Sequence, residues 1–346
     1  MSPARTPLRV AGCDPGTSGL DLLILEDGAV ADQYRVSPQE LHADASAPVR
    51  WLMERGPFAL IAGPSGYGLP LVPAQDCTER ERALMTLMRP DERGRGGQGI
   101  SGFSALLNAL CRSELPVVFL PGVIHLPTVP EHRKINRIDL GTPDKLCVAA
   151  LALATRAADP TAYRACVVEL GSAFTACVVI DGGRVVDGLG GTSGTCGWES
   201  GGAWDGELAY LLSPLSKRDL FTGGAASVPD AATGRRMFVE SLLKAVAGLR
   251  AVTPFDEVVL SGRLLESEPD LAYQVAAALG ELRDVVKLEA LPGAWVKHAA
   301  QGAAVLADGL AGGRYAGVVE RLRLREAAGT VLTWLCHPRA AEIRIG

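Results

Sequence analysis

The sequence predicts an α/β fold built from two similar halves. The main observation is an internal repeat: a strand, a turn with an acid and Gly, Ser or Thr, a second strand, a Gly turn and a third strand. The copies occupy residues 8–36 and 163–190. A composition of 48% hydrophobic and 5% aromatic residues with 40 glycines suits helices packed closely on sheets. We therefore expect two equivalent domains, residues 1–160 and 161–346, with a cleft between them.

The remaining composition excludes several classes of protein. Charged residues make up 21% of the chain, which argues against disorder, and the net charge of −5 without a basic block argues against nucleic acid or membrane partners. No apolar run is long enough to span a membrane, and no apolar segment typical of a signal peptide occurs near the N-terminus. The expected location is cytoplasmic, with the eight cysteines as reduced thiols.

The first half is expected to open with three antiparallel strands, because two short turns join them. The elements expected in this half are strands at 8–13, 20–25, 29–36, 58–64 and within 116–126, and helices at 39–55, 79–89, 101–112 and 143–158. The second half repeats the opening. Its expected elements are strands at 163–170, 175–181, 184–190 and 256–262, and helices at 206–212, 234–253, 271–279, 295–313 and within 315–335.

The first turn of each repeat has the chemistry of a phosphate site. In the first copy, Asp14 is followed by Gly16, Thr17 and Ser18, so that backbone N–H groups and hydroxyls can hold phosphate oxygens. The Asp14 carboxylate can hold Mg²⁺, since this ion prefers one or two carboxylates together with phosphates and water. The alternative is an ordinary hairpin turn.

The second copy places Glu169, Gly171, Ser172 and Thr175 in the same arrangement. Either turn alone could be an ordinary hairpin, but an acid, a glycine and a hydroxyl at matching places in two repeats strengthen the prediction of a phosphate and metal site. A third segment, Ser261 and Gly262, ends a strand with small residues that let the backbone approach a flat ligand such as adenosine.

In this order, the three segments resemble the phosphate-1, phosphate-2 and adenosine motifs of the acetate kinase/sugar kinase/Hsp70/actin superfamily, over roughly residues 8–310. Residues 136–146 (NRIDLGTPDKL) and 324–331 (LREAAGTV) resemble an uncharacterised family of predicted butyrate kinases. The chain departs from acetate kinases in lacking the two histidines of the corresponding segment, with Asp144 at the second. It also has Glu169 and Ser172 where many relatives have Asp and Gly.

The resemblance implies two ribonuclease-H-like domains, as in actin-like ATPases, with ATP and Mg²⁺ in an interdomain nucleotide cleft. Asp14 and Glu169 would organise the metal. Phosphates would contact Gly16, Thr17, Ser18, Gly171, Ser172 and Thr175, and adenosine would lie at Ser261 and Gly262. A homodimer is likewise implied by the resemblance alone.

The acceptor of the phosphoryl group is a small molecule, for which the sequence leaves two classes open. A carboxylate needs no general base but needs cations, and Arg133 and Arg137 are the candidates. An alcohol needs a base, for which Asp139 is preferred over Asp144, a candidate helix cap. The sequence thus predicts an ATP- and Mg²⁺-dependent phosphotransferase, with a small-carboxylate, butyrate-like kinase preferred over a kinase of a hydroxylated metabolite.

Two non-kinase alternatives share the expected fold. One is an activator ATPase that holds an iron–sulfur cluster between two copies, for which Cys196 would be the available loop thiol. The other is a sensor that binds ATP without turnover.

Overall fold

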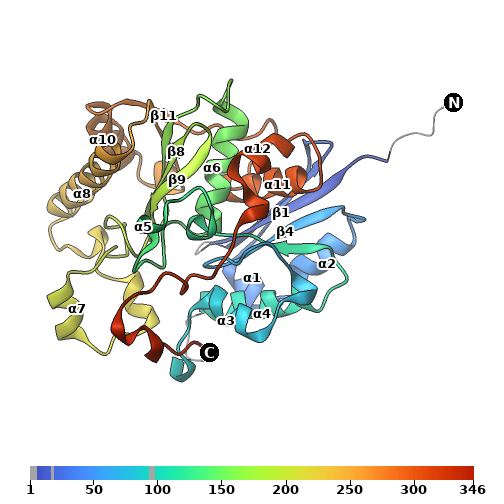
Figure 1. Cartoon of the computed structure of the whole chain (residues 1–346), viewed down its shortest axis with the longest axis horizontal. Helices are drawn as coiled ribbons and strands as arrows, with labels where there is room; N and C mark the ends of the chain where they lie inside the picture. The colour runs from blue at the N-terminus through green and yellow to red at the C-terminus, as the bar shows by residue number, and fades with distance from the viewer. Residues whose placement is uncertain (1–5, 17–18, 93–97) are drawn as a thin grey trace.

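Two mixed β-sheets carry the two halves of the chain in the computed structural model, which describes residues 6–16, 19–92 and 98–346 (Figure 1). The first sheet has the strand order β3-β2-β1-β4-β6-β5, and the second has the order β11-β10-β7-β8-β9. The first sheet consists of β1 (Arg9–Gly16), β2 (Gly19–Glu26), β3 (Ala29–Val36), β4 (Leu60–Gly63), β5 (Val72–Pro73) and β6 (Val117–Phe119). The second consists of β7 (Ala165–Leu170), β8 (Thr175–Asp181), β9 (Arg184–Leu189), β10 (Glu257–Ser261) and β11 (Asp284–Lys287).

The two sheets repeat one topology, which confirms the predicted internal repeat. In the first, β1, β2 and β3 form an antiparallel meander, and β4 and then β6 continue parallel to β1. In the second, β7, β8 and β9 form the meander, and β10 and β11 continue parallel to β7. The α/β fold predicted from the two hairpin repeats is therefore present, with the turns that carry Asp14 and Glu169 at equivalent places.

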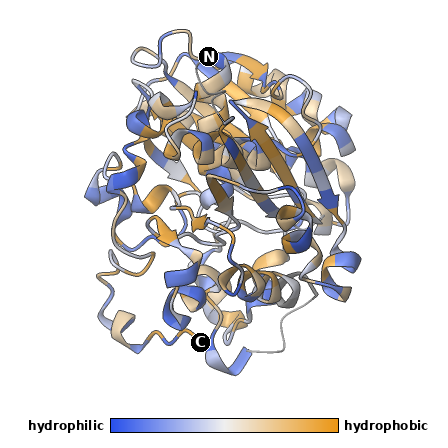
Figure 2. Ribbon diagram, turned by 90° about the vertical axis from the view of Figure 1, so that its right-hand side faces the viewer, coloured by the Kyte–Doolittle hydropathy of each residue, from blue (hydrophilic) through white to orange (hydrophobic). Residues whose placement is uncertain are grey.

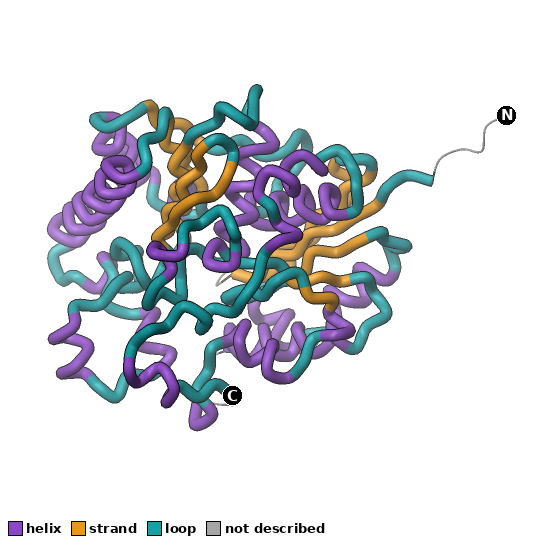
Figure 3. Tube along the Cα trace, viewed as in Figure 1, coloured by secondary structure: helices purple, strands orange, loops and turns teal. Residues whose placement is uncertain are grey.

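Helices separate the two sheets and cover their outer faces (Figure 3). The α-helices of the first half are α1 (Pro38–Ala43), α2 (Ala47–Met53), α3 (Glu79–Thr86), α4 (Gln98–Cys111), α5 (Glu131–Lys134) and α6 (Pro143–Arg156). Those of the second half are α7 (Gly206–Leu212), α8 (Ala231–Val252), α9 (Leu264–Ser267), α10 (Pro269–Gly280), α11 (His298–Leu310) and α12 (Ala316–Leu322). Short 3₁₀ turns include Val123–His125 and Lys217–Phe221.

The helices α6 and α11 lie side by side between the sheets (Figure 1). Their backbones approach so closely that a Cβ on Gly302 would lie 1.8 Å from the carbonyl oxygen of Cys147. The helix α11 also packs directly on β1, where a Cβ on Gly12 would lie 2.1 Å from the amide nitrogen of Ala304. The strands β1 to β6 form the first sheet and β7 to β11 the second, whereas α11, which follows β11 in the chain, packs on the first sheet.

Two apolar cores result from this arrangement. The larger one contains the first sheet, α6 and α11, and the smaller one lies between the second sheet and the helices α8 and α10. Apolar strands lie in the interior, and polar residues lie on the outside of many helices (Figure 2). In the smaller core, Phe238 and Leu242 of α8 and Leu271 of α10 are completely or almost completely buried, so these helices hold the second sheet from outside.

Three local expectations are corrected by the structure. The helix expected at 39–55 is broken into α1 and α2, because Asp44 leaves the helical conformation and its carboxylate accepts a hydrogen bond from the Ser46 amide at 3.0 Å. The strand expected within 116–126 is short, and Pro121-Gly122 lead into a 3₁₀ turn. The strand β11 was missed, since its four residues are partly exposed and lack a continuous apolar run.

No helix in the described part of the chain is both long and apolar enough to cross a bilayer.

Candidate functional site

The first hairpin turn carries Asp14 near the end of β1, where Gly16 pairs with Gly19 of β2. The Asp14 residue is only 5% exposed. The ammonium of Lys297 lies 3.5 Å from the Asp14 Oδ2 atom and donates to the Gly19 carbonyl at 3.3 Å. It also covers Gly16, where an added Cβ would lie 2.5 Å from Nζ. Thr17 and Ser18, predicted phosphate contacts, lie outside the described residues.

The second hairpin turn carries Glu169 near the end of β7. It is closed by a hydrogen bond that the Gly171 amide donates to the Phe174 carbonyl at 3.0 Å, and Ser172 at its tip is partly exposed. Thr175 differs from the other predicted phosphate contacts, because its residue is fully buried and its hydroxyl has no hydrogen-bond partner among the described residues. Gly171 and Ser172 are therefore the accessible part of this turn.

The first turn of α6 lies against Glu169. The ammonium of Lys145 is 2.8 Å from the Glu169 Oε2 atom and 2.5 Å from the Asp144 Oδ2 atom. Burial alone would lower the pKa of Lys145, but Asp144 and Glu169 raise it well above its usual value. Asp144 also accepts a short hydrogen bond from the Thr142 hydroxyl. Lys145 is therefore a charged group that links α6 of the first half to the acid of the second.

A reciprocal arrangement results. Helix α6 of the first half supplies Lys145 to Glu169, and the segment just before α11 of the second half supplies Lys297 to Asp14. Burial raises the pKa of Asp14 to about 7, Lys297 and Lys145 oppose that rise, and Asp144 and Glu169 contribute to it. Because these groups affect one another's charge, the two hairpins form a single electrostatic cluster of three acids and two lysines.

The predicted adenosine segment adjoins the second hairpin. Ser261 of β10 pairs in register with Glu169 of β7, and Gly262 follows it with φ +108°. A Cβ on Gly262 would lie 2.3 Å from the Leu170 carbonyl oxygen, so only glycine fits this contact. The hydroxyl of Ser261 is 2.8 Å from Nδ1 of His298, the first residue of α11. The strand end, the helix start and the second hairpin turn are thus neighbours.

The residues predicted to bind or activate the acceptor do not gather in one place. Asp139 is buried, and its two carboxylate oxygens accept hydrogen bonds from the Gly141 amide at 3.0 Å and from the Thr192 amide and hydroxyl at 3.1 and 3.0 Å. Arg133 donates to the Val186 carbonyl of β9 at 2.8 Å and lies 3.3 Å from Asp187. Arg137 is exposed. The structure therefore engages Arg133 with the edge of the second sheet and leaves Arg137 at the surface.

The acids fit Mg²⁺ only in the mode in which phosphates and water complete the coordination. In the described part of the chain, no group of three His, Cys, Asp or Glu side chains could hold a metal ion without further ligands. Mg²⁺ commonly uses one or two carboxylates with substrate phosphates and several waters. Asp14 and Glu169 offer two such carboxylates, and each lies beside an ammonium group, of Lys297 and of Lys145, that would have to make room for the ion.

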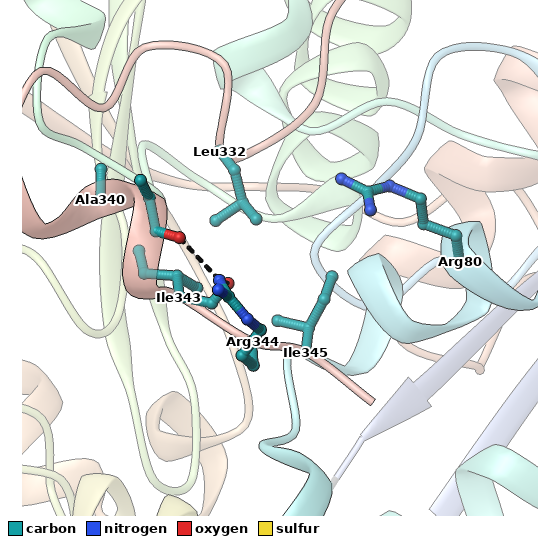
Figure 4. Close-up of a pocket in the computed structure, with 7 residues that line it drawn as sticks. Arg80, Leu332, Ala340, Ile343, Arg344 and Ile345 are labelled. Atoms are coloured by element: carbon teal, nitrogen blue, oxygen red, sulfur yellow. Dashed lines mark hydrogen bonds between the residues drawn. The ribbon is translucent and has the colours of Figure 1, made fainter.

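Other candidate features lie elsewhere. A cavity of about 480 Å³ is lined by Arg80, Leu332 and residues of the C-terminal segment, and includes none of the predicted site residues (Figure 4). All eight cysteines are free. Cys196 is partly buried and lies 3.5 Å from the Ser241 hydroxyl oxygen, whereas Cys336 is exposed.

Sequence reasoning missed Lys297 and His298 and assigned no role to Lys145. The sequence did contain a signal for each of them. All three residues lie at the start of a helix, and a side chain in that position can reach a neighbouring turn. That signal is weak, because Lys and His residues at helix starts usually face solvent. Only the packing of α6 and α11 between the sheets directs these side chains to Glu169, Asp14 and Ser261.

Solved structures with the same architecture include kinases of small molecules. An acetate kinase from Entamoeba histolytica has a TM-score of 0.55 and 10% identity, covering 79% of this chain and 87% of its own. A propionate kinase from Francisella tularensis has a TM-score of 0.53 and 13% identity, covering 86% and 98%. At these identities the likeness establishes the fold alone, an α/β fold with two mixed sheets that this chain shares with both proteins.

No curated protein matches the sequence. A family match does extend over residues 12–337 and therefore includes both sheets except the first residues of β1, both hairpin turns and the two central helices. The family is described as "Protein of unknown function (DUF1464)", and this chain belongs to it.

Proposed function

We propose that the protein is an ATP- and Mg²⁺-dependent phosphotransferase that converts a small carboxylate into an acyl phosphate. The observation that carries the proposal is the cluster at the two equivalent hairpins, where Asp14 and Glu169 each lie beside a lysine delivered by a central helix. Acids that can organise a metal, cations that can neutralise phosphate charge, and turns that can offer backbone N–H groups to phosphate oxygens are what phosphoryl transfer requires.

Each turn would hold part of the nucleotide. Gly16 with Thr17 and Ser18, and Gly171 with Ser172 and Thr175, would contact phosphates through backbone N–H groups and hydroxyls. For Thr175 this requires the turn to open, because its hydroxyl is buried. Ser261 and Gly262 would lie against the adenosine, with His298 beside them. Lys297, which covers Gly16, would move from the Gly19 carbonyl to a phosphate oxygen.

Asp14 and Glu169 would hold Mg²⁺, directly or through water. When bound, the ion would neutralise charge on the phosphates that are being transferred. The chain's own groups keep Asp14 available for this role, since Lys297 and Lys145 oppose the rise that burial causes in the pKa of its carboxyl group.

A carboxylate is preferred as the acceptor because it is already ionised near neutral pH and needs no base. Its oxygen would form a bond to the γ-phosphorus while the bond from that phosphorus to the bridging oxygen of ADP breaks. The hydrogen bonds to Asp139 support this choice, since both of its carboxylate oxygens already accept from Gly141 or Thr192, and an acceptor hydroxyl would compete with these contacts. The acetate and propionate kinases of the same fold also support it.

The roles of the two predicted arginines differ. Arg137 is exposed near the start of α6 and can move to grip an acceptor carboxylate. Arg133 could do so only by leaving Asp187 and the Val186 carbonyl. A kinase of a hydroxylated metabolite, with Asp139 as the base, is the second candidate, and the buried position of Asp139 beside the start of α6 is what favours it.

The test is to incubate the protein with ATP, Mg²⁺ and each straight-chain carboxylate from acetate to hexanoate, and to trap acyl phosphate with hydroxylamine. We expect a hydroxamate from the wild type, a decrease of about 100-fold or more in Asp14→Asn, and no change in Asp284→Asn, which alters an exposed acid on β11. Equal product from Asp14→Asn would refute the role of Asp14. Release of ADP only with hydroxylated compounds would favour the second candidate.

A further inference from the structure

Besides Lys145, a second cation, Lys217, lies close to the start of α6, where it is paired with Tyr67. Neither residue belongs to the hairpins or to the predicted arginines. The ammonium of Lys217 donates to the Tyr67 hydroxyl at 3.1 Å and lies 4.4 Å from the centroid of the Tyr67 ring. Tyr67 follows β4 in the first half, whereas Lys217 starts a 3₁₀ turn in the second. The pair therefore joins the two halves of the chain.

Backbone contacts hold both residues in place. The Lys217 amide donates to the Glu92 Oε1 atom at 2.7 Å, and the preceding Ser216 donates from its amide and hydroxyl to Asp219 at 2.6 and 2.7 Å. The Tyr67 amide donates to the Met85 carbonyl at 3.0 Å. Because the main chain is fixed on both sides, the ammonium and the hydroxyl are oriented before any ligand arrives.

The charge of Lys217 is not balanced by a contacting acid. Among the residues that the structure describes, no carboxylate lies within ion-pair distance of its ammonium, although Asp139 and Glu92 act on it from further away. Glu92 uses its other oxygen for Arg89 at 3.3 Å, and the oxygens of Asp139 accept from Gly141 and Thr192. A partly buried cation in this position has free donor capacity for an anion.

This pair is connected to the phosphoryl-transfer cluster. Burial raises the pKa of the Tyr67 hydroxyl, Asp139 adds to that rise and the Thr192 side chain opposes it, so the three groups lie near one another. Thr192 also donates to Asp139 at 3.0 Å. Gly68, next to Tyr67, lies against the first residue of α6, since a Cβ there would be 3.1 Å from Cγ of Pro143. Lys145 stands two residues further along the same helix. An anion at Lys217 would therefore lie beside the helix start that reaches Glu169.

We propose that Lys217 and Tyr67 bind the carboxylate of the phosphoryl acceptor, as the ammonium and hydroxyl donors of its subsite. The inference rests on the proposed function. It names Lys217 as the cation that binds the acceptor, in a region of the sequence for which no site residue was predicted. Two charge-assisted hydrogen bonds would orient the acceptor with one carboxylate oxygen toward the γ-phosphate.

The first experiment compares kinetic constants in Lys217→Gln, Tyr67→Phe and Arg218→Gln, the last being a matched change of the neighbouring exposed cation. We expect Lys217→Gln to raise the KM for the carboxylate about 10- to 100-fold with the KM for ATP unchanged. Tyr67→Phe should have a smaller effect, since the ring remains, and Arg218→Gln should have none. An unchanged carboxylate KM in Lys217→Gln, with folding verified by circular dichroism, would overturn the inference.

The second experiment needs no turnover. The wild type is labelled with a small reagent that modifies lysine amines. The labelling is done in sodium chloride, in each carboxylate from acetate to hexanoate, or in inorganic phosphate. Mass spectrometry then compares the extent of labelling at Lys217 with that at the exposed Lys287. Protection of Lys217 by a carboxylate supports the inference. Protection by phosphate alone, or by no anion, overturns it. Protection by a carboxylate without acyl phosphate formation would refute the proposed reaction and leave the binding site standing.

Discussion

The ammonium of Lys297 lies 3.5 Å from a carboxylate oxygen of Asp14, although 283 positions separate the two residues in the chain. Lys145 and Glu169 repeat the relationship across the other hairpin. In each case a helix that lies between the sheets brings a cation to an acid at the end of a strand. The site is therefore a product of how the halves pack, and its properties can be tested through that packing.

Replacing Lys297 by Met should weaken ATP binding and slow turnover about 10- to 100-fold, because the lysine neutralises Asp14 and covers the turn at Gly16. The loss should appear in the KM for ATP and in the turnover number. Lys287→Met, which changes an exposed lysine of β11, is the control. Identical kinetics in the two variants would contradict a role for Lys297 at the phosphates.

Removing Lys145 should destabilise the protein more than removing the charge of Glu169. Lys145→Met leaves both Asp144 and Glu169 without their cation, whereas Glu169→Gln leaves the Lys145–Asp144 pair intact. Breaking a largely buried ion pair typically costs about 3–5 kcal/mol. Urea unfolding of the two variants and of the double variant gives the loss in the free energy of unfolding for each. The coupling free energy between Lys145 and Glu169 follows from the three values, and we expect it to be about 1–3 kcal/mol. The reverse order of stability would contradict this arrangement.

Gly262→Ala should abolish or strongly weaken ATP binding, since the new Cβ would meet the Leu170 carbonyl oxygen at 2.3 Å beside the second hairpin. Gly293→Ala is the matched control. Its φ of +83° imposes comparable backbone strain, but no atom lies within 4 Å of its added Cβ. Titration calorimetry with a non-hydrolysable ATP analogue distinguishes the variants, and equal affinities would show that the adenosine does not lie at Gly262.

Binding of the acceptor carboxylate should weaken as the pH rises through about 8. Burial lowers the pKa of Lys217 from 10.5 to about 8, with Asp139 and Glu92 opposing the decrease and Tyr67 facing the ammonium. The folded-state pKa is lower than the unfolded one, so the ammonium that attracts the anion is lost above about pH 8. The same difference in pKa affects stability. Burying the charged ammonium lowers the free energy of unfolding at all pH values below about 8, and this loss is recovered as the pH rises from about 8 toward 10.5.

The measurement is the carboxylate KM between pH 6 and pH 10, compared in the wild type and in Lys217→Gln. The variant should show a high KM with no inflection near pH 8. An inflection of the same size in both proteins would assign the titration to another group.

Local signals in the sequence were sufficient for the three antiparallel strands of each sheet and for the places of Asp14 and Glu169 near the ends of β1 and β7. The strands around Asp14 and Glu169 are apolar runs closed by turn residues, and the two copies reinforce each other. The start of α6 was also predictable, because Pro143 follows Thr142 at its cap. These features depend on neighbours in the chain, and sequence patterns describe such neighbours directly.

The cations of the site depend on contacts between distant segments and were not predictable in the same way. Lys297 and Lys217 lie beside Asp14 and Tyr67 only after the two halves have packed together. Arg133 shows the opposite case, since its place in a basic segment favoured an acceptor role, whereas folding brings it to Asp187 at the edge of the second sheet. Charge in a sequence identifies candidates, but burial and geometry decide their partners.

The contact between Gly302 and Cys147 also has a mechanical consequence. The two backbones meet there so closely that residue 302 has no room for a side chain. Because α11 packs on β1 and α6 contacts β7 and β8, each helix lies against the sheet whose acid its lysine meets. The contact therefore sets the spacing between the two lysine–acid pairs. A bulkier residue at 302 would push the helices, and with them the two pairs, apart.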